Sequence, residues 1–168
     1  MSDLRQGIWW GGAGRRHARA VTSNLPHDGR AAADAARVAA LVNRYLVSLD
    51  DEELDEAWAS GLFTEDAVVA FPMSRHEGIG GLARWHRAAL SVFEATQHLG
   101  SPAVVDVDGG RAVFRAHVLT THVHRGGAGL FRAGTLARGE ARRTRGGWRL
   151  ASLSLRVLFT EGSPPRRE

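Results

Sequence analysis

The 168-residue chain contains no cysteine and no lysine. The absence of cysteine excludes a disulfide framework, a thiolate zinc site and a cysteine nucleophile. No apolar run approaches the roughly 20 residues that span a bilayer, and the N-terminus lacks a signal-peptide pattern, so we expect a cytoplasmic protein that does not bind membranes. The hydrophobic fraction of 43% and the charged fraction of 24% are ordinary for one globular domain.

All 22 basic side chains are arginines, and the formal net charge is +4. Together with the many alanines and glycines, this usage is typical of a GC-rich, actinomycete-like genome. The arginines are scattered along the chain instead of forming one stripe with aromatic residues between them, so we expect no nucleic-acid partner.

Three regions differ in their sequence pattern. Residues 1–30 mix glycine, arginine and a tryptophan pair without sustained periodicity, and we expect a mobile N-terminal arm. Residues 31–161 carry regular helix and strand patterns and are predicted to form one domain. Residues 162–168, with two adjacent prolines, are predicted to be a disordered tail.

Helical periodicity dominates the first half of the domain. A first helix is expected from about Asp34 to Asp50, because apolar residues recur at helical spacing. A second, short helix is expected to follow at once and to end at Gly61. A third helix is expected after a polar loop over residues 73–80. Its predicted apolar face contains Leu82, Trp85, Ala89, Leu90 and Phe93.

Strand patterns dominate the second half. Residues 67–71 form a short strand before the third helix, and two hairpins over 103–124 and 130–160 turn at glycine pairs. Helices gathered before a largely antiparallel sheet indicate an α+β domain, in which three N-terminal helices pack inside a strongly curved sheet as an open cone. The last strand is partly apolar on both faces, so we expect the outer face to pack on a second copy in a homodimer.

A carboxylate, an imidazole and a phenol suggest a proton-transfer site. The candidates are Asp50 at the end of the first helix, His98 in the run Thr96–His98, and Tyr45. Each has a structural alternative: Asp50 has capping-box spacing with Glu53, His98 fits a hydrogen-bonded core histidine, and Tyr45 lies on the apolar helix face.

Four stretches resemble the SnoaL-like, NTF2-like superfamily: Leu49-Asp50, residues 62–69, Thr96–His98 and residues 146–150. The resemblance covers about residues 33–160 and implies the same cone. Within the superfamily, the chain resembles the branch that contains scytalone dehydratase, hexachlorocyclohexane dehydrochlorinase and bile-acid 7α-dehydratase. The resemblance implies that Asp50 and His98 form a catalytic dyad, and Tyr45 has a counterpart in the bile-acid enzyme.

The chain also departs from the scytalone dehydratase pattern. Phe71 stands where that enzyme has a tyrosine, and Thr135 matches its serine. Its second pocket histidine would fall at Val123, although His122 and His124 flank this position and a one-residue strand shift would reverse their facing. We therefore do not transfer its substrate to this chain.

The predicted chemistry is proton transfer without a metal or organic cofactor. An imidazole titrates near pH 6.5 in water, so His98 suits the role of general base, with Asp50 fixing its tautomer. Tyr45 would donate to a substrate carbonyl and stabilise an enolate. The substrate-binding residues predicted to line the pocket are Trp58, Phe71, Trp85, Phe93, His117, Leu119, Val123 and Thr135.

These expectations favour a lyase or isomerase of natural-product biosynthesis. The predicted reaction is dehydration, isomerisation or cyclisation of a hydrophobic polyketide- or steroid-like small molecule. A shape-selective cyclase that needs no dyad is the nearest alternative. A non-catalytic ligand-binding module and the small subunit of a ring-hydroxylating oxygenase share the expected fold.

Overall fold

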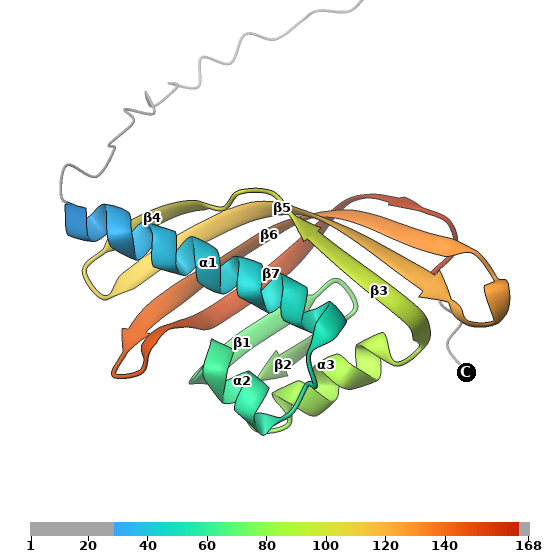
Figure 1. Ribbon diagram of the computed structural model, residues 1–168, viewed down its shortest axis with the longest axis horizontal. Helices are drawn as coiled ribbons and strands as arrows, with labels where there is room; N and C mark the ends of the chain where they lie inside the picture. The colour runs from blue at the N-terminus through green and yellow to red at the C-terminus, as the bar shows by residue number, and fades with distance from the viewer. Residues whose placement is uncertain (1–28, 165–168) are drawn as a thin grey trace, which may run out of the picture.

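The computed structural model describes residues 29–164. They form three α-helices on one side of a seven-stranded sheet (Figure 1). The helices are α1 (Gly29–Asp51), α2 (Glu56–Leu62) and α3 (Leu82–Leu90). The strands are β1 (Phe63–Phe71), β2 (Ser74–Glu77), β3 (Phe93–Gly100), β4 (Val104–Asp108), β5 (Arg111–His124), β6 (Leu130–Thr144) and β7 (Gly147–Glu161). The predicted α+β class is confirmed, whereas the N-terminal arm and most of the tail lie outside the described residues.

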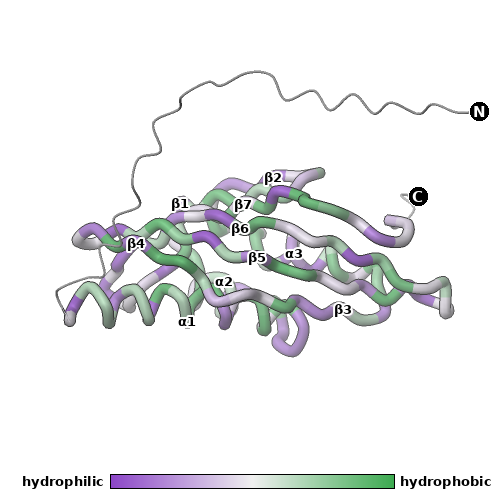
Figure 2. The backbone as a smooth tube through the Cα atoms, turned by 90° about the horizontal axis from the view of Figure 1, so that it is seen from above, coloured by the Kyte–Doolittle hydropathy of each residue, from purple (hydrophilic) through white to green (hydrophobic). Residues whose placement is uncertain are grey.

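The sheet is mixed. Its strand order is β2-β1-β7-β6-β5-β3, and β4 pairs with the other end of β5. The pair β1–β7 is parallel, and the remaining pairs are antiparallel. Figure 2 shows β5, β6 and β7 running side by side along the length of the molecule, with β3 beside β5. As an edge strand, β3 leaves main-chain groups open to the helix that packs beside it.

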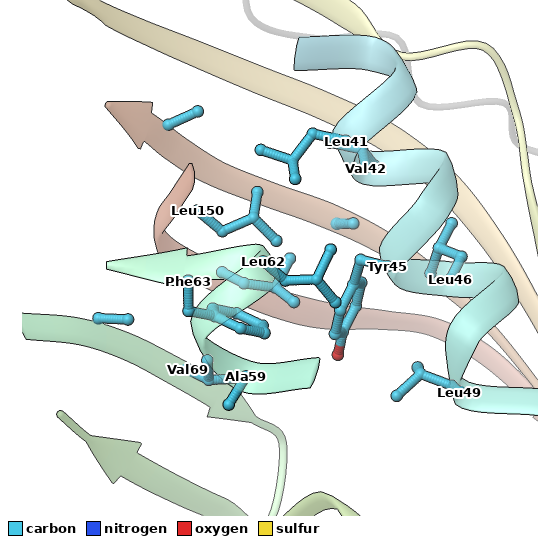
Figure 3. Close-up of a cluster of buried hydrophobic side chains, with 14 of the residues drawn as sticks. Leu41, Val42, Tyr45, Leu46, Leu49, Ala59, Leu62, Phe63, Val69 and Leu150 are labelled. Atoms are coloured by element: carbon cyan, nitrogen blue, oxygen red, sulfur yellow. The ribbon is translucent and has the colours of Figure 1, made fainter. Parts of the chain in front are cut away.

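The apolar stripe of α1 fills the space between the helix and the sheet. Val38, Val42 and Tyr45 recur at helical spacing and are each no more than 2% exposed. Figure 3 shows Val42 and Tyr45 on the side of α1 that faces Leu62, Phe63 and Leu150, which come from α2, β1 and β7. The stripe therefore packs against the continuous α2–β1 segment and against β7, which is distant in sequence, to form one core.

The first half of the chain corrects several predicted boundaries. α1 begins at Gly29, β1 begins at Phe63, and the predicted polar loop contains the short strand β2. Phe93 opens β3 instead of extending the apolar face of the third helix. A bulge next to Phe93 lets the chain turn directly from α3 into the sheet.

The carboxylate that caps α2 is Asp55. Its side chain accepts a hydrogen bond from the main-chain nitrogen of Trp58 at 2.7 Å. Asp50 instead lies in the last turn of α1, which ends at Asp51. The capping alternative for Asp50 is therefore wrong, and its carboxylate is available for another partner.

A buried carboxylate attaches the N-terminal half of α1 to the β6–β7 hairpin. Asp34 is 2% exposed and accepts hydrogen bonds from Arg143, from Trp148 Nε1 at 3.2 Å and from Arg37 at 3.1 Å. The hydrogen bond from Arg143 is the main cause that lowers the pKa of Asp34 to about 2, against the opposing effect of burial. The guanidinium of Arg143 also lies 4.7 Å from the ring centroid of Trp148.

Candidate active site

Asp50 and His98 are in direct contact. Asp50 Oδ1 lies 2.7 Å from His98 Nδ1 and accepts a second hydrogen bond from Thr96 Oγ1 at 2.8 Å. Asp50 Oδ2 accepts the main-chain N–H of His98 at 2.6 Å. The carboxylate is thus held at both oxygens by residues of one strand.

Helix and strand periodicities align to bring this contact about. Leu46 and Asp50 are four residues apart and share one face of α1, while Gly100 and His98 share one face of β3. Leu46 lies against Gly100, where an added Cβ would come within 2.6 Å of Leu46 Cδ1. The absence of a side chain at Gly100 therefore lets α1 approach β3 closely enough for Asp50 to reach His98.

The contact fixes the tautomer of the imidazole. A carboxylate only accepts hydrogen bonds, so His98 Nδ1 carries the proton and a neutral ring keeps its lone pair on Nε2. No side chain or main chain of the described residues bonds to that Nε2. The side chains of His98 and Asp50 are 9% and 20% exposed, although Asp50 as a whole residue counts as exposed because it stands at a helix end. The pair is therefore shielded but reachable.

A second histidine, which the sequence analysis did not select, shares this face of the sheet. The β3–β5 register pairs Thr96 with His122 and His98 with Thr120. The rings of His98 and His122 lie 6.1 Å apart between centroids and meet edge to face. The second histidine of the family pattern was assigned to Val123, and this placement is wrong, because Val123 points to the opposite face.

The surroundings of His122 disfavour the charged form of its ring. Phe93 packs against it at 4.2 Å between centroids and Phe131 at 5.6 Å. Its Nδ1 lies 3.3 Å from the carbonyl oxygen of Phe131, so Nδ1 carries the proton. Burial is the main cause that lowers the pKa of His122. Phe93, predicted to line the pocket, thus lies next to the site through its contact with His122.

Tyr45 is committed to a different partner. It is 2% exposed, and its hydroxyl lies 3.1 Å from His86 Nε2. His86 Nδ1 lies 2.9 Å from the carbonyl oxygen of Leu82, so Nδ1 donates and Nε2 accepts the proton of the Tyr45 hydroxyl. Burial raises the pKa of Tyr45 well above its ordinary value and lowers that of His86 to about 4. The hydroxyl predicted to donate to a substrate is therefore already engaged.

Three of the predicted pocket residues gather around His86. Trp58 meets its ring at 5.0 Å, and Phe71 meets it at 5.5 Å between centroids. Trp85 stacks on Phe71 at 4.7 Å. Trp58 is buried and donates from Nε1 to Ser48 Oγ at 2.8 Å, whereas Phe71 and Trp85 are partly buried. These rings form an aromatic cluster around His86, and their role in lining a substrate pocket stays a prediction.

Three other predicted pocket residues lie on the outer face of the sheet. Alternation along β5 turns His117, Leu119 and Val123 away from the side that carries His98. His117 and Leu119 instead help line an outer hollow of about 350 Å³ together with Phe159. Placing these three residues in the pocket was wrong. Thr135 faces inward and is buried, with its hydroxyl 3.4 Å from the carbonyl oxygen of Val118.

A second hollow, of about 410 Å³, reaches His98. It lies between α1 and the connection from β3 to β4. Its lining consists of Ala39, Asn43, Leu46, Val47, His98, Leu99, Gly100, Ser101, Pro102 and Ala103. Among residues 29–164, no group of three or more acidic or histidine side chains is placed to hold a metal ion, and none of the helices is long and apolar enough to cross a membrane.

Comparison with known proteins identifies the family and the fold. The family model described as a SnoaL-like domain matches residues 30–154. The chain therefore belongs to the SnoaL-like family, and its cone is the NTF2-like fold. A search of curated proteins returned no match.

Three solved structures illustrate the likeness. A protein from Kribbella flavida is 27% identical, with a TM-score of 0.71, and the match covers 78% of this chain and 95% of that one. A protein from Novosphingobium aromaticivorans, provisionally described as a scytalone dehydratase, is 20% identical with a TM-score of 0.72 and coverage of 80% and 91%. A type 2 hexachlorocyclohexane dehydrochlorinase is 17% identical with a TM-score of 0.69 and coverage of 80% and 95%. At the last two identities, the likeness establishes the fold.

Proposed function

We propose that the chain is a cofactor-independent enzyme that uses His98 and Asp50 to move a proton on a hydrophobic small molecule. The reaction class is dehydration, isomerisation or cyclisation, and the substrate class is polyketide- or steroid-like. The observation that carries this proposal is that both oxygens of Asp50 are engaged by β3. They accept hydrogen bonds from the ring and the main chain of His98 and from the Thr96 hydroxyl.

The geometry supports the following steps. His98 Nε2, the free lone pair, accepts a proton from a carbon next to a substrate carbonyl. The positive charge that forms on the ring is stabilised by the Asp50 carboxylate at Nδ1. In a dehydration, the same Nε2–H then protonates the leaving hydroxyl, the carbon–oxygen bond breaks, and water departs as the carbon–carbon double bond forms. The proton removed from carbon leaves in the water, so His98 returns to its neutral state.

The names of two fold relatives favour elimination within this class. One is described as a dehydratase and the other as a dehydrochlorinase, and both names denote loss of a small molecule across a carbon–carbon bond. The partly buried aromatic surface of Phe71 and Trp85 supports a flat apolar substrate.

The test uses a substrate that reports carbon deprotonation directly. The base-promoted ring opening of 5-nitrobenzisoxazole removes one C–H proton, breaks the N–O bond and releases a coloured cyanonitrophenolate. We expect wild type to accelerate it, and Asp50→Asn and His98→Gln to lower kcat/KM by about 100-fold or more. Asp51→Asn is the matched control, because Asp51 is the exposed neighbour of Asp50 at the end of α1.

Two outcomes would redirect the proposal. Equal activity in Asp50→Asn and Asp51→Asn would remove the dyad and favour a cyclase that acts by shape. Absence of any rate above the buffer reaction would favour a non-catalytic binding module.

We also propose a homodimer formed through the outer face of the sheet. Leu99, Leu119, Leu158 and Phe159 remain 39–61% exposed there. These four side chains come from β3, β5 and β7 and line one hollow, so they form an apolar patch that a second copy would cover.

A further inference from the structure

Thr120 is a buried hydroxyl residue beside His98. It is 5% exposed, and the β3–β5 register places it directly opposite His98. Residues directly opposite on one face of an antiparallel pair have their Cβ atoms about 4.5–5.5 Å apart. The Thr120 side chain therefore stands against the imidazole of the proposed base.

The Thr120 hydroxyl has no protein partner within residues 29–164. Thr96 Oγ1 and Thr135 Oγ1, on neighbouring positions of the same face, both donate hydrogen bonds. No such bond is made by Thr120, yet no fully enclosed side-chain oxygen or nitrogen of the described residues lacks a partner. The Thr120 hydroxyl therefore borders open space on the inner face. The hydroxyl is thus available to donate to a group that binds on this face.

Two histidine rings share this face of the sheet with Thr120. His98 Nδ1 is engaged by Asp50, and His122 Nδ1 is engaged by the carbonyl oxygen of Phe131. In the neutral form, each ring therefore presents Nε2 as a lone pair, which accepts and does not donate. Of these three neighbouring groups, only the Thr120 hydroxyl has a proton to give to a neutral oxygen.

Proton removal next to a carbonyl needs such a donor. Negative charge moves onto the carbonyl oxygen as the carbon loses its proton, and a preorganised donor stabilises that charge. Tyr45 cannot take this role in the observed arrangement, because its hydroxyl proton goes to His86.

We propose that Thr120 is the substrate-binding residue that donates to the substrate oxygen on which charge develops. This inference rests on the proposed function and restricts the substrate class. The substrate would carry a carbonyl or other acceptor oxygen next to the carbon that His98 deprotonates. An analogue without that oxygen would leave Thr120 unsatisfied and would be rejected.

The kinetic test compares Thr120→Val with Thr120→Ser in the ring opening of 5-nitrobenzisoxazole, whose oxygen becomes a phenolate. Valine keeps the shape and removes the donor, and we expect kcat to fall about tenfold or more with little change in KM. Serine should retain at least a third of the wild-type kcat. Thr121→Val is the matched control, because Thr121 is the next residue of β5 and faces the outer side. If Thr120→Val fails to fold, as judged by circular dichroism, Thr120→Ala replaces it.

A binding test separates this inference from the proposed function. Calorimetry measures the affinity of each variant for 4-nitrophenol and for nitrobenzene, which lacks the hydroxyl oxygen. We expect Thr120→Val to weaken nitrophenol binding about 5- to 30-fold and to leave nitrobenzene unchanged. This pattern in a protein without catalysis would support the role of Thr120 and refute the base. Equal behaviour of Thr120→Val and Thr121→Val in both tests would overturn the role of Thr120, whatever His98 does.

Discussion

The buried His86 should make the protein lose stability in mild acid. The folded protein holds the pKa of His86 at about 4, whereas the ordinary value is 6.5. Burial is the main cause, and the nearby charges of His76 and His98 act in the same direction. Protonation would also remove the lone pair that accepts the Tyr45 hydroxyl.

The sign and size follow from linkage. Below pH 6.5 the unfolded chain binds a proton at this residue, and the folded chain binds none until the pH approaches 4, so falling pH favours unfolding. The contribution of His86 is nil above pH 6.5 and grows to a loss of about 3 kcal/mol near pH 4, at about 1.4 kcal/mol for each pH unit. Asp34, with its pKa lowered to about 2, loses its stabilising effect only below pH 3.8, in a separate window.

The assay is urea unfolding followed by tryptophan fluorescence at several pH values between 7 and 4.5. His86→Gln removes the titrating group and keeps a polar side chain between α3 and Tyr45. We expect the variant to be less stable at pH 7 but to lose about 2 kcal/mol less than wild type across this range. Parallel pH profiles for the two proteins would show that His86 already accepts a proton in the folded state and would refute the reasoning.

Three further perturbations have defined outcomes. Asp34→Ala removes the acceptor shared by Arg143, Trp148 and Arg37, so thermal unfolding should occur at a lower midpoint, while Asp51→Asn should not change it. Gly100→Ala introduces a Cβ within 2.6 Å of the buried Leu46 and should lower the free energy of unfolding by about 1–3 kcal/mol. Gly61→Ala, with open space at its Cβ, should raise the free energy of unfolding by about 0.5–1 kcal/mol, and equal values for the two variants would contradict this. Light scattering should give twice the 18.2 kDa chain mass, and Leu119→Glu should give monomers while Met73→Glu, exposed on the β1–β2 connection, should not.

The cone and the contact between Asp50 and His98 could be predicted from the sequence, but it could not be predicted which face of the sheet each strand residue points to. His122 and Val123 are adjacent, and only the β3–β5 register decides which one shares a face with His98. In β7, Leu150 and Leu153 are both buried although strict alternation would separate them. A bulge in the β6–β7 pairing, between Glu140 and Ala141, turns both leucines toward the same face of the sheet. No residue pattern in the sequence predicts this bulge.

Helix geometry alone explains why Tyr45 and Asp50 do not point to the same place. Five residues along an α-helix correspond to a rotation of about 140°, so Tyr45 and Asp50 project from nearly opposite sides of α1. Tyr45 lies on the same helix face as Val38 and Val42, which packs into the core, and its hydroxyl contacts His86 there. Asp50 lies on the same helix face as Leu46, and this face packs against β3. The Tyr45 hydroxyl is therefore engaged on the core side of α1, whereas Thr120 lies on the sheet directly opposite His98 and is the better placed of the two hydroxyls to act with that base.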